Sequence, residues 1–130
     1  MHSTKDLSII VPLLNEAESL NELCTWIKRV VSLMKVSYEI ILIDDGSTDT
    51  SWDVIKKLSR EDKNIIGFQF IRNYGKSAAL QVGFQACKGQ VVITMDADLQ
   101  DSPDEIPVLY QKIKEEKYHL ISGWKAKRYD

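Results

Sequence analysis

Histidine and cysteine are scarce in this chain of 130 residues, which contains two of each. His2 and His119 are too few for a multi-histidine metal site and argue against a Ser-His-Asp triad. Cys24 and Cys87 lack Cys-x-x-Cys spacing, so we interpret both as reduced, packed thiols. The residue types that remain for a metal site are oxygen donors.

An excess of charge of one sign is also missing. The chain has 17 Lys and Arg against 19 Asp and Glu, a formal charge of −2, and an isoelectric point near 5.7. Domains that bind nucleic acid through a broad basic surface usually have isoelectric points above about 9. We therefore expect no nucleic acid partner.

Long apolar runs are absent. The longest Ile/Leu/Val runs, such as 40–43, have four members, whereas a membrane span needs about 20 apolar residues. The first six residues have neither the basic start nor the apolar stretch of a signal peptide. The sequence alone therefore predicts a cytoplasmic chain without a membrane-spanning segment.

Prolines number three, and no repeat or Pro/Gly-rich linker divides the chain, so residues 1–130 are expected to form one unit. Short β-branched runs alternate with stretches of helical periodicity, a pattern typical of βαβ units and a parallel sheet. We predict an α/β fold, a doubly wound, mostly parallel sheet with helices on both faces. Its strands are expected at 7–11, 38–43, 65–71, 91–95 and 119–122, and its helices at 19–34, 50–60, 77–86 and 103–116.

Local signals set the expected boundaries of these elements. Pro12 cannot donate to a strand ladder and is predicted to close the first strand. Ser19 with Glu22 has the spacing of a capping box at the start of the first helix. A second capping box begins at Ser102, with proline at the first helical position.

Charged residues follow every predicted strand. In a doubly wound sheet, ligands bind beyond the carboxyl ends of the strands, where these loops gather. Acidic residues dominate the second and fourth loops, and basic residues the third and fifth. This distribution suits a metal ion together with an anionic ligand.

The segment Asp96-Ala97-Asp98 directly follows the most apolar strand. On an extended backbone, residues two apart project to the same side, so both carboxylates could face one point. Like charges so close repel unless a cation separates them, and oxygen ligands favour Mg²⁺ or Mn²⁺. The alternative is that the two aspartates cap the strand and solubilise a turn.

Two other loops leave alternatives open. The segment 44–49, Asp-Asp-Gly-Ser-Thr-Asp, is typical of a tight turn with helix caps, yet one cap does not explain a doubled aspartate. Gly75-Lys76-Ser77 resembles the end of a P-loop, but Phe70 stands where that motif needs glycine. Arg72 and Lys76 could bind phosphate at the next helix or form a solvated basic loop.

Taken in order, four segments resemble the N-terminal part of family 2 glycosyltransferases with a GT-A fold, in particular those that use polyprenyl phosphates. They are Pro-Leu-Leu-Asn-Glu at 12–16, Asp-Asp-Gly-Ser-Thr-Asp at 44–49, Arg-Asn-Tyr-Gly-Lys at 72–76 and Met-Asp-Ala-Asp-Leu-Gln-Asp at 95–101. The resemblance covers all 130 residues of the chain, but these correspond to only about the first half of the family's catalytic domain. It implies a polypeptide truncated at its C-terminus, with membrane association only through segments beyond it, at the inner face of the membrane.

The resemblance also implies roles for individual residues. Asp45 would contact the base, and Asp96, Asp98 and Gln100 would hold Mg²⁺ or Mn²⁺ on the diphosphate. The family tends to have Gly-x-Arg after the fifth strand. Here Lys125 or Arg128 would supply the positive charge that contacts the diphosphate. The full set implied to bind substrate is Pro12, Leu14, Asn15, Glu16, Ile43, Asp45, Arg72, Lys76, Asp96, Ala97 and Lys125.

The activity implied is inverting transfer of a sugar from a UDP- or GDP-linked donor to a polyprenyl phosphate. Asp98 would act through the metal, and Asp101 is the candidate general base. The alternative is a non-catalytic module that binds a nucleotide or a metal. A receiver-type phosphorylation domain fits less well, because its acidic residues would follow the first strand and its phosphoacceptor the third.

If Asp98 holds the metal, Asp98→Asn should abolish metal-dependent nucleotide binding while the fold is preserved. Titration calorimetry with and without Mn²⁺ measures this, and Mn²⁺-dependent affinity equal to that of the wild type would contradict the assignment.

Overall fold

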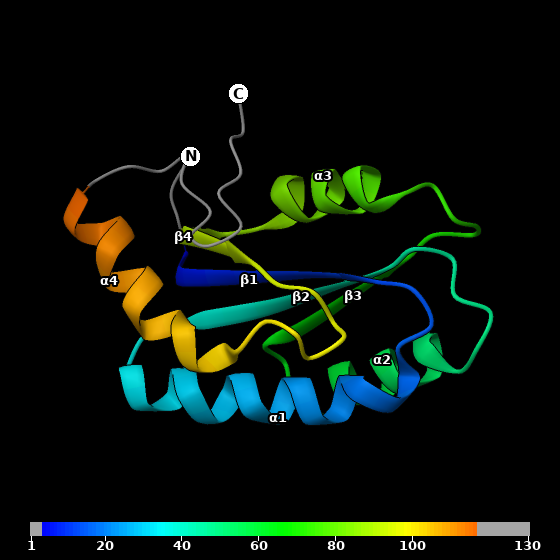
Figure 1. Ribbon diagram of the computed structural model, residues 1–130, viewed down its shortest axis with the longest axis horizontal. Helices are drawn as coiled ribbons and strands as arrows, with labels where there is room; N and C mark the ends of the chain where they lie inside the picture. Colours follow the sequence, from blue (N-terminus) through cyan, green and yellow to red (C-terminus); the bar gives the residue numbers. More distant parts are fainter. Residues whose placement is uncertain (1–3, 117–130) are drawn as a thin grey trace.

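Four parallel strands lie side by side in the order β3-β2-β1-β4, in a computed structural model that describes residues 4–116 (Figure 1). The strands are β1 (Lys5–Leu13), β2 (Tyr38–Asp44), β3 (Ile65–Gln69) and β4 (Gly89–Thr94). The helices are α1 (Ala17–Met34), α2 (Ser51–Glu61), α3 (Lys76–Ala86) and α4 (Ile106–Glu116), with a short 3₁₀ turn η1 (Pro103–Glu105) before α4. The predicted doubly wound parallel sheet is confirmed. The strand expected at 119–122 lies outside the described residues.

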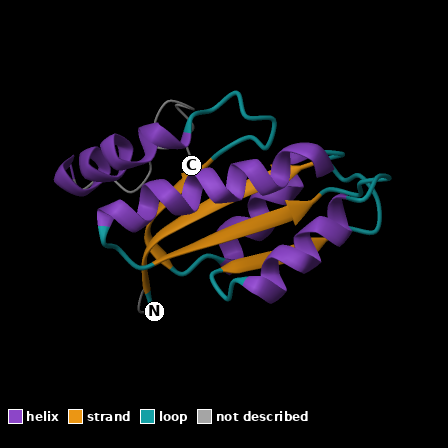
Figure 2. Cartoon of the chain, turned by 90° about the horizontal axis from the view of Figure 1, so that it is seen from below, coloured by secondary structure: helices purple, strands orange, loops and turns teal. Residues whose placement is uncertain are grey.

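Helices cover both faces of the sheet. Helices α1, α2 and α4 lie on one face and α3 on the other, as Figure 1 shows. Figure 2, a view from below, shows α1 lying across the face of the sheet. Successive residues of a strand point to opposite faces. Ile9 and Leu42 therefore belong to the core under α1, whereas Ile10 and Ile41 belong to the core under α3.

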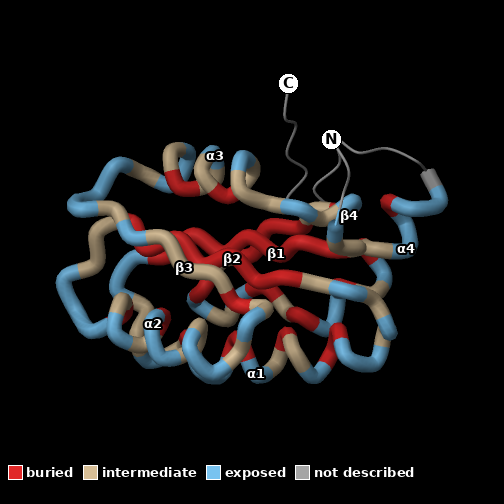
Figure 3. The backbone as a smooth tube through the Cα atoms, turned by 180° about the vertical axis from the view of Figure 1, so that it is seen from behind, coloured by how far each residue is buried: buried red, intermediate tan, exposed pale blue. Residues whose placement is uncertain are grey.

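The two central strands are buried on both sides (Figure 3). This position explains why 40–43 is a continuous run of Ile and Leu instead of an alternating pattern. The apolar stripe of α1 faces the same core at steps of one, three and four residues, as its periodicity predicts. Its buried members are Leu20, Leu23, Cys24, Ile27, Val30 and Val31.

Pro12 does not close β1, so that prediction is wrong. The strand continues to Leu13, which pairs with Asp44 of β2. Alternate residues of β1 direct their backbone groups to β4 and to β2: the Ile10 carbonyl accepts from Met95 N, and the Leu13 carbonyl accepts from Asp45 N. Pro12 faces the β4 side, where pairing has already ended at Ile10, so its missing N–H breaks no ladder bond.

The capping box expected at Ser19 is also wrong. Helix α1 begins at Ala17, and Ser19 lies inside its first turn. The amides at the start of the helix have acceptors from the segment after β2 instead, because Glu16 N, at the N-cap, donates to Ser51 Oγ at 3.0 Å and Ala17 N donates to Asp49 Oδ2 at 3.3 Å. A local sequence motif could not reveal acceptors supplied by a distant segment.

At Ser102 the N-cap and the proline at the first helical position are confirmed, since Ser102 Oγ accepts from Asp104 N at 3.2 Å. The bond expected of a capping box differs, because Glu105 N donates to the Ser102 carbonyl and not to Oγ. The first turn is 3₁₀ rather than α-helical. Strand β3 ends at Gln69, two residues earlier than expected, and Ile71 is 88% exposed. Within the part of the chain that the structure describes, no helix has the length and apolarity to cross a membrane.

Gly83 brings α3 into close contact with the sheet. A Cβ at this position would lie 2.5 Å from Ile10 Cγ2 and 3.1 Å from Ile43 Cδ1. Alanine gains about 1 kcal/mol of helix propensity over glycine, but overpacking costs about 1–3 kcal/mol. We therefore expect Gly83→Ala to lower the free energy of unfolding by up to about 2 kcal/mol in urea denaturation.

Gln85→Ala, at an exposed position of the same helix, is the matched control and should change the free energy of unfolding by less than about 0.5 kcal/mol. A Gly83→Ala protein more stable than the wild type would contradict the close packing.

Candidate functional site at the carboxyl edge of the sheet

A pocket of about 330 Å³ is lined by residues at the carboxyl ends of the strands. The strands point with these ends to the right-hand side of Figure 1. Loops that are far apart in the sequence meet there, as expected for a parallel sheet. The pocket is lined by Pro12, Leu13, Leu14, Asp45, Asn73, Gly75, Lys76 and Asp96.

Asn15 joins the loop after β1 to the loop after β2. Its Oδ1 accepts hydrogen bonds from Thr48 N at 2.8 Å and Asp49 N at 3.2 Å, and its own N–H donates to Ser47 Oγ at 2.8 Å. Its φ of 55° lies in the left-handed region, which asparagine tolerates better than most residues. Asn15 thus holds two loops together and does not line the pocket.

Asp45 joins the loop after β2 to the loop before α3. The residue is 6% exposed, and its carboxylate accepts from Tyr74 N at 2.8 Å and from Gly75 N at 3.1 Å. Gly75, with a φ of 106°, is the N-cap of α3, so the carboxylate lies at the positive end of that helix. Asp45 also lines the pocket, and its contact with a base stays a prediction.

Gly46 lets these two loops approach closely. Its φ is +83°, and a Cβ there would collide with the backbone of Arg72 and Asn73. The chain bends at Gly46, and the neighbouring loop leaves room only for a residue without a Cβ there.

Lys76 joins the start of α3 to the loop after β4. Its Nζ lies 2.7 Å from Asp96 Oδ1. The crossover from β3 to β4 passes over β2 and β1, so α3 packs on the central strands and its first residue lies above the pocket. The Lys76–Asp96 ion pair thereby connects the segments that follow β3 and β4, the two outer strands of the sheet.

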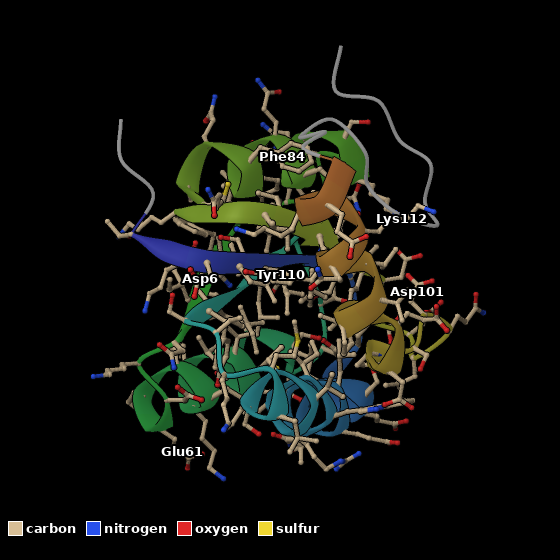
Figure 4. All side chains as sticks on the ribbon, turned by 90° about the vertical axis from the view of Figure 1, so that its left-hand side faces the viewer. Asp6, Glu61, Phe84, Asp101, Tyr110 and Lys112 are labelled. Atoms are coloured by element: carbon tan, nitrogen blue, oxygen red, sulfur yellow. The ribbon has the colours of Figure 1, made fainter. Side chains whose placement is uncertain are left out.

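Ser19 joins the loop after β4 back to α1. Its Oγ donates to the Ala97 carbonyl at 2.7 Å. Within that loop, Asp96 N donates to Asp101 Oδ2 at 3.0 Å, and Gln100 N donates to Asp98 Oδ1 at 3.1 Å. Asp101 is 8% exposed and lies beside the start of α4 in Figure 4. Its carboxylate closes the loop and does not line the pocket.

The doubled aspartate has a structural explanation. Asp44 is the last residue of β2 and Asp45 is the first residue after it, and their carboxylates have different partners. Asp44 is fully buried, and its Oδ1 accepts from Ser47 N at 2.8 Å. Its Oδ2 is buried without a hydrogen-bond partner.

Asp49 is the third acidic residue of the segment 44–49. Hydrogen bonding to Ser51 lowers the pKa of Asp49 below its ordinary value of 3.8.

The carboxylates of Asp96 and Asp98 have different partners, because Asp96 Oδ1 lies 2.7 Å from Lys76 Nζ and Asp98 Oδ1 accepts from Gln100 N. Among the described residues, no three His, Cys, Asp or Glu side chains form a group that could hold a metal ion. Strand β4 ends at Thr94, so the segment is a loop in which residues two apart need not share a side. Asp96 lines the pocket, whereas Asp98 is exposed outside its lining.

The donor chemistry nevertheless fits a hard divalent cation. Asp96, Asp98 and Gln100 offer oxygen atoms within one short loop. Mg²⁺ commonly takes one or two protein carboxylates and completes its shell with water and substrate phosphates.

Five of the predicted substrate residues line the pocket: Pro12, Leu14, Asp45, Lys76 and Asp96. Leu13, Asn73 and Gly75 line it and were not predicted, although the last two belong to the same motif as Lys76. Arg72 is exposed, with its Nε donating to the Tyr74 hydroxyl at 3.1 Å. The other predicted residues outside the lining are Asn15, Glu16, Ile43, Ala97, Asp98, Gln100 and Asp101, while Lys125 and Arg128 fall outside the described residues.

The family described as Glycosyl transferase family 2 matches residues 8–130. The chain is 40% identical over 127 residues to the undecaprenyl-phosphate 4-deoxy-4-formamido-L-arabinose transferase of Pseudomonas syringae pv. syringae (strain B728a), covering 97% of the chain and 37% of that protein. Its namesake from Pseudomonas fluorescens (strain SBW25) is 45% identical over 107 residues, covering 82% of the chain and 31% of the relative. The chain thus spans well under half the length of these curated relatives.

Solved structures share the fold. Staphylococcus aureus TarS 1-349 in complex with UDP superposes with a TM-score of 0.67 at 23% identity, covering 86% of this chain and 33% of that chain. The Pyrobaculum calidifontis mannosyltransferase PcManGT, in complex with GDP-Man and Mn²⁺, gives 0.62 at 22% identity, covering 75% and 29%. These likenesses confirm the expected GT-A architecture.

Asp45 is expected to stabilise the loop before α3. Because Asp45→Asn weakens the hydrogen bonds from two backbone amides, we expect faster hydrogen exchange at Tyr74 and Gly75 and a loss of about 1–3 kcal/mol in the free energy of unfolding. Asp53→Asn, whose side chain is 72% exposed on α2, is the control and should change neither. Unchanged exchange at both amides in Asp45→Asn would show that the carboxylate does not hold this loop.

Proposed function

Given that this chain belongs to glycosyl transferase family 2, we propose that its pocket binds the nucleotide diphosphate of a sugar donor, and that the protein transfers the sugar to a polyprenyl phosphate. The family match agrees with the resemblance of the four loop segments. The observation that carries the proposal is the pocket itself, where Asp45, Lys76 and Asp96 converge at the carboxyl edge of the sheet.

The donor is proposed to be linked to UDP or GDP. Two solved structures that share the fold are described as complexes with UDP and with GDP-Man. The pocket combines an apolar wall of Pro12, Leu13 and Leu14 with a carboxylate and a lysine. An apolar wall suits a base, and charged groups that fix orientation suit the diphosphate.

The acceptor is proposed from the relatives. Both are named undecaprenyl-phosphate transferases. A lipid phosphate is largely ionised near pH 7, since the second pKa of a phosphate monoester is about 6. Such an acceptor oxygen can attack the anomeric carbon, with inversion, without a strong general base, and the reaction would take place at the inner face of the membrane.

The chain's own residues would bind and orient the donor. Lys76 and the backbone amides at the start of α3 present positive charge to the diphosphate. Asp96, Asp98 and Gln100 would hold Mg²⁺ or Mn²⁺. When bound, such an ion stabilises the charge that develops on the leaving diphosphate. Asp101 remains the candidate general base, although its carboxylate already accepts from Asp96 N.

Titration calorimetry with UDP, GDP and their sugars, with and without Mn²⁺, tests the proposal. We expect one nucleotide to bind, with affinity raised about tenfold or more by Mn²⁺, because the cation neutralises charge on both partners. Asp96→Asn should remove most of this gain, whereas Asp53→Asn on α2 should retain it.

Absence of binding by both nucleotides, with and without Mn²⁺, would contradict the proposal. Binding without sugar transfer to polyprenyl phosphate, by this chain and by one extended past Asp130, would favour a non-catalytic nucleotide-binding module.

A further inference from the structure

The ion pair between Lys76 and Asp96 spans the pocket. Both residues line the pocket, and the 2.7 Å separation of Nζ and Oδ1 is that of a charge-assisted hydrogen bond. The side chains are 58% and 31% exposed, so the pair lies at the mouth of the pocket and not in the core. An incoming ligand therefore meets this ion pair.

The position of Lys76 is fixed by the backbone before it. Asp45 accepts the amides of Tyr74 and Gly75, the two residues that precede Lys76. Asp96 is held from the other side, because its own N–H donates to Asp101 Oδ2. Both charges thus stand on anchored backbone, while the lysine retains a flexible four-carbon stem.

The charges lining the pocket are two carboxylates and one lysine. An anionic diphosphate is repelled by the carboxylates, and a divalent cation is repelled by the lysine. If the pocket binds both ligands, one charged group must change its partner. Lys76 is the group able to do so, because its ammonium is a compact point charge that can move from a carboxylate to a phosphate.

We propose that Lys76 acts as the counter-ion of Asp96 before ligands bind, releases this carboxylate to the divalent cation, and then donates to the diphosphate. The inference rests on the proposed function and deepens it. Solvent-exposed ion pairs contribute little free energy, so a doubly charged ion can displace Lys76, and the exchange couples metal binding to phosphate binding.

The first test measures Mn²⁺ binding alone, by electron paramagnetic resonance, with no nucleotide and no turnover. Lys76→Gln removes both the competitor and the repelling charge, so we expect Mn²⁺ to bind about three- to tenfold more tightly than in the wild type. Lys76→Arg keeps the charge and should stay near the wild-type affinity. Lys57→Gln removes an exposed ion pair of α2, with Glu61 at 3.8 Å, and serves as the matched control without effect.

The second test measures UDP and GDP binding in the presence of EDTA. Without metal, the lysine is the charge that holds the diphosphate, so Lys76→Gln should weaken binding by about three- to tenfold. The same substitution thus changes the two affinities in opposite directions, which a merely structural role for Lys76 would not produce.

Equal or weaker Mn²⁺ affinity in Lys76→Gln, or no Mn²⁺ binding by any variant, would overturn the exchange. Unchanged metal-free nucleotide affinity would overturn the transfer of Lys76 to the phosphate. A tighter Mn²⁺ complex together with no nucleotide binding by the wild type would support the competition for Asp96 and contradict the proposed function instead.

Discussion

The site depends on a ring of contacts that joins four loops at the carboxyl edge of the sheet. Asn15 connects the first loop to the second, Asp45 the second to the third, Lys76 the third to the fourth, and Ser19 returns from the fourth to α1. In two of these four links, those of Asn15 and Asp45, a side-chain oxygen of one loop accepts backbone N–H groups of the next. Loops without regular structure must satisfy their backbone groups in some way, and here the partners are the neighbouring loops.

This arrangement gives a pocket whose walls are held before a ligand arrives. Preorganised donors and charges cost no reorganisation when they act on a ligand. The links differ in strength, however. Asp45 is almost fully buried and accepts backbone amides, whereas Lys76 and Asp96 form a partly exposed ion pair. The link made by Asp45 between the second and third loops is therefore stable. The ion pair between Lys76 and Asp96 is the link that a charged ligand can replace.

The fold and the site differ in how far the sequence predicts them. Strand and helix order, the parallel sheet and the apolar face of α1 follow from hydrophobic periodicity, a local property. The expectations that Pro12 ends the strand and that Ser19 caps the helix are wrong because other elements set their surroundings. Strand β1 continues beyond its pairing with β4, and Asp49 and Ser51 accept hydrogen bonds from the amides at the start of α1. The four loops were identified from their motifs. The spacing of residues does not encode loop conformations. It could therefore not predict that Asp45 accepts backbone amides or that Asp98 lies outside the pocket lining.

The central claim is that the ring encloses a nucleotide diphosphate site. The most direct measurement is a two-dimensional ¹H–¹⁵N NMR titration of the chain with UDP and with GDP in the presence of Mg²⁺, which leaves nearby signals visible. We expect the largest amide shifts at Leu13, Leu14, Asp45, Gly75 and Lys76, with smaller shifts at the opposite end of the sheet. Shifts concentrated instead around Ser8, Glu39 and Lys88, at the amino ends of the strands, would contradict it.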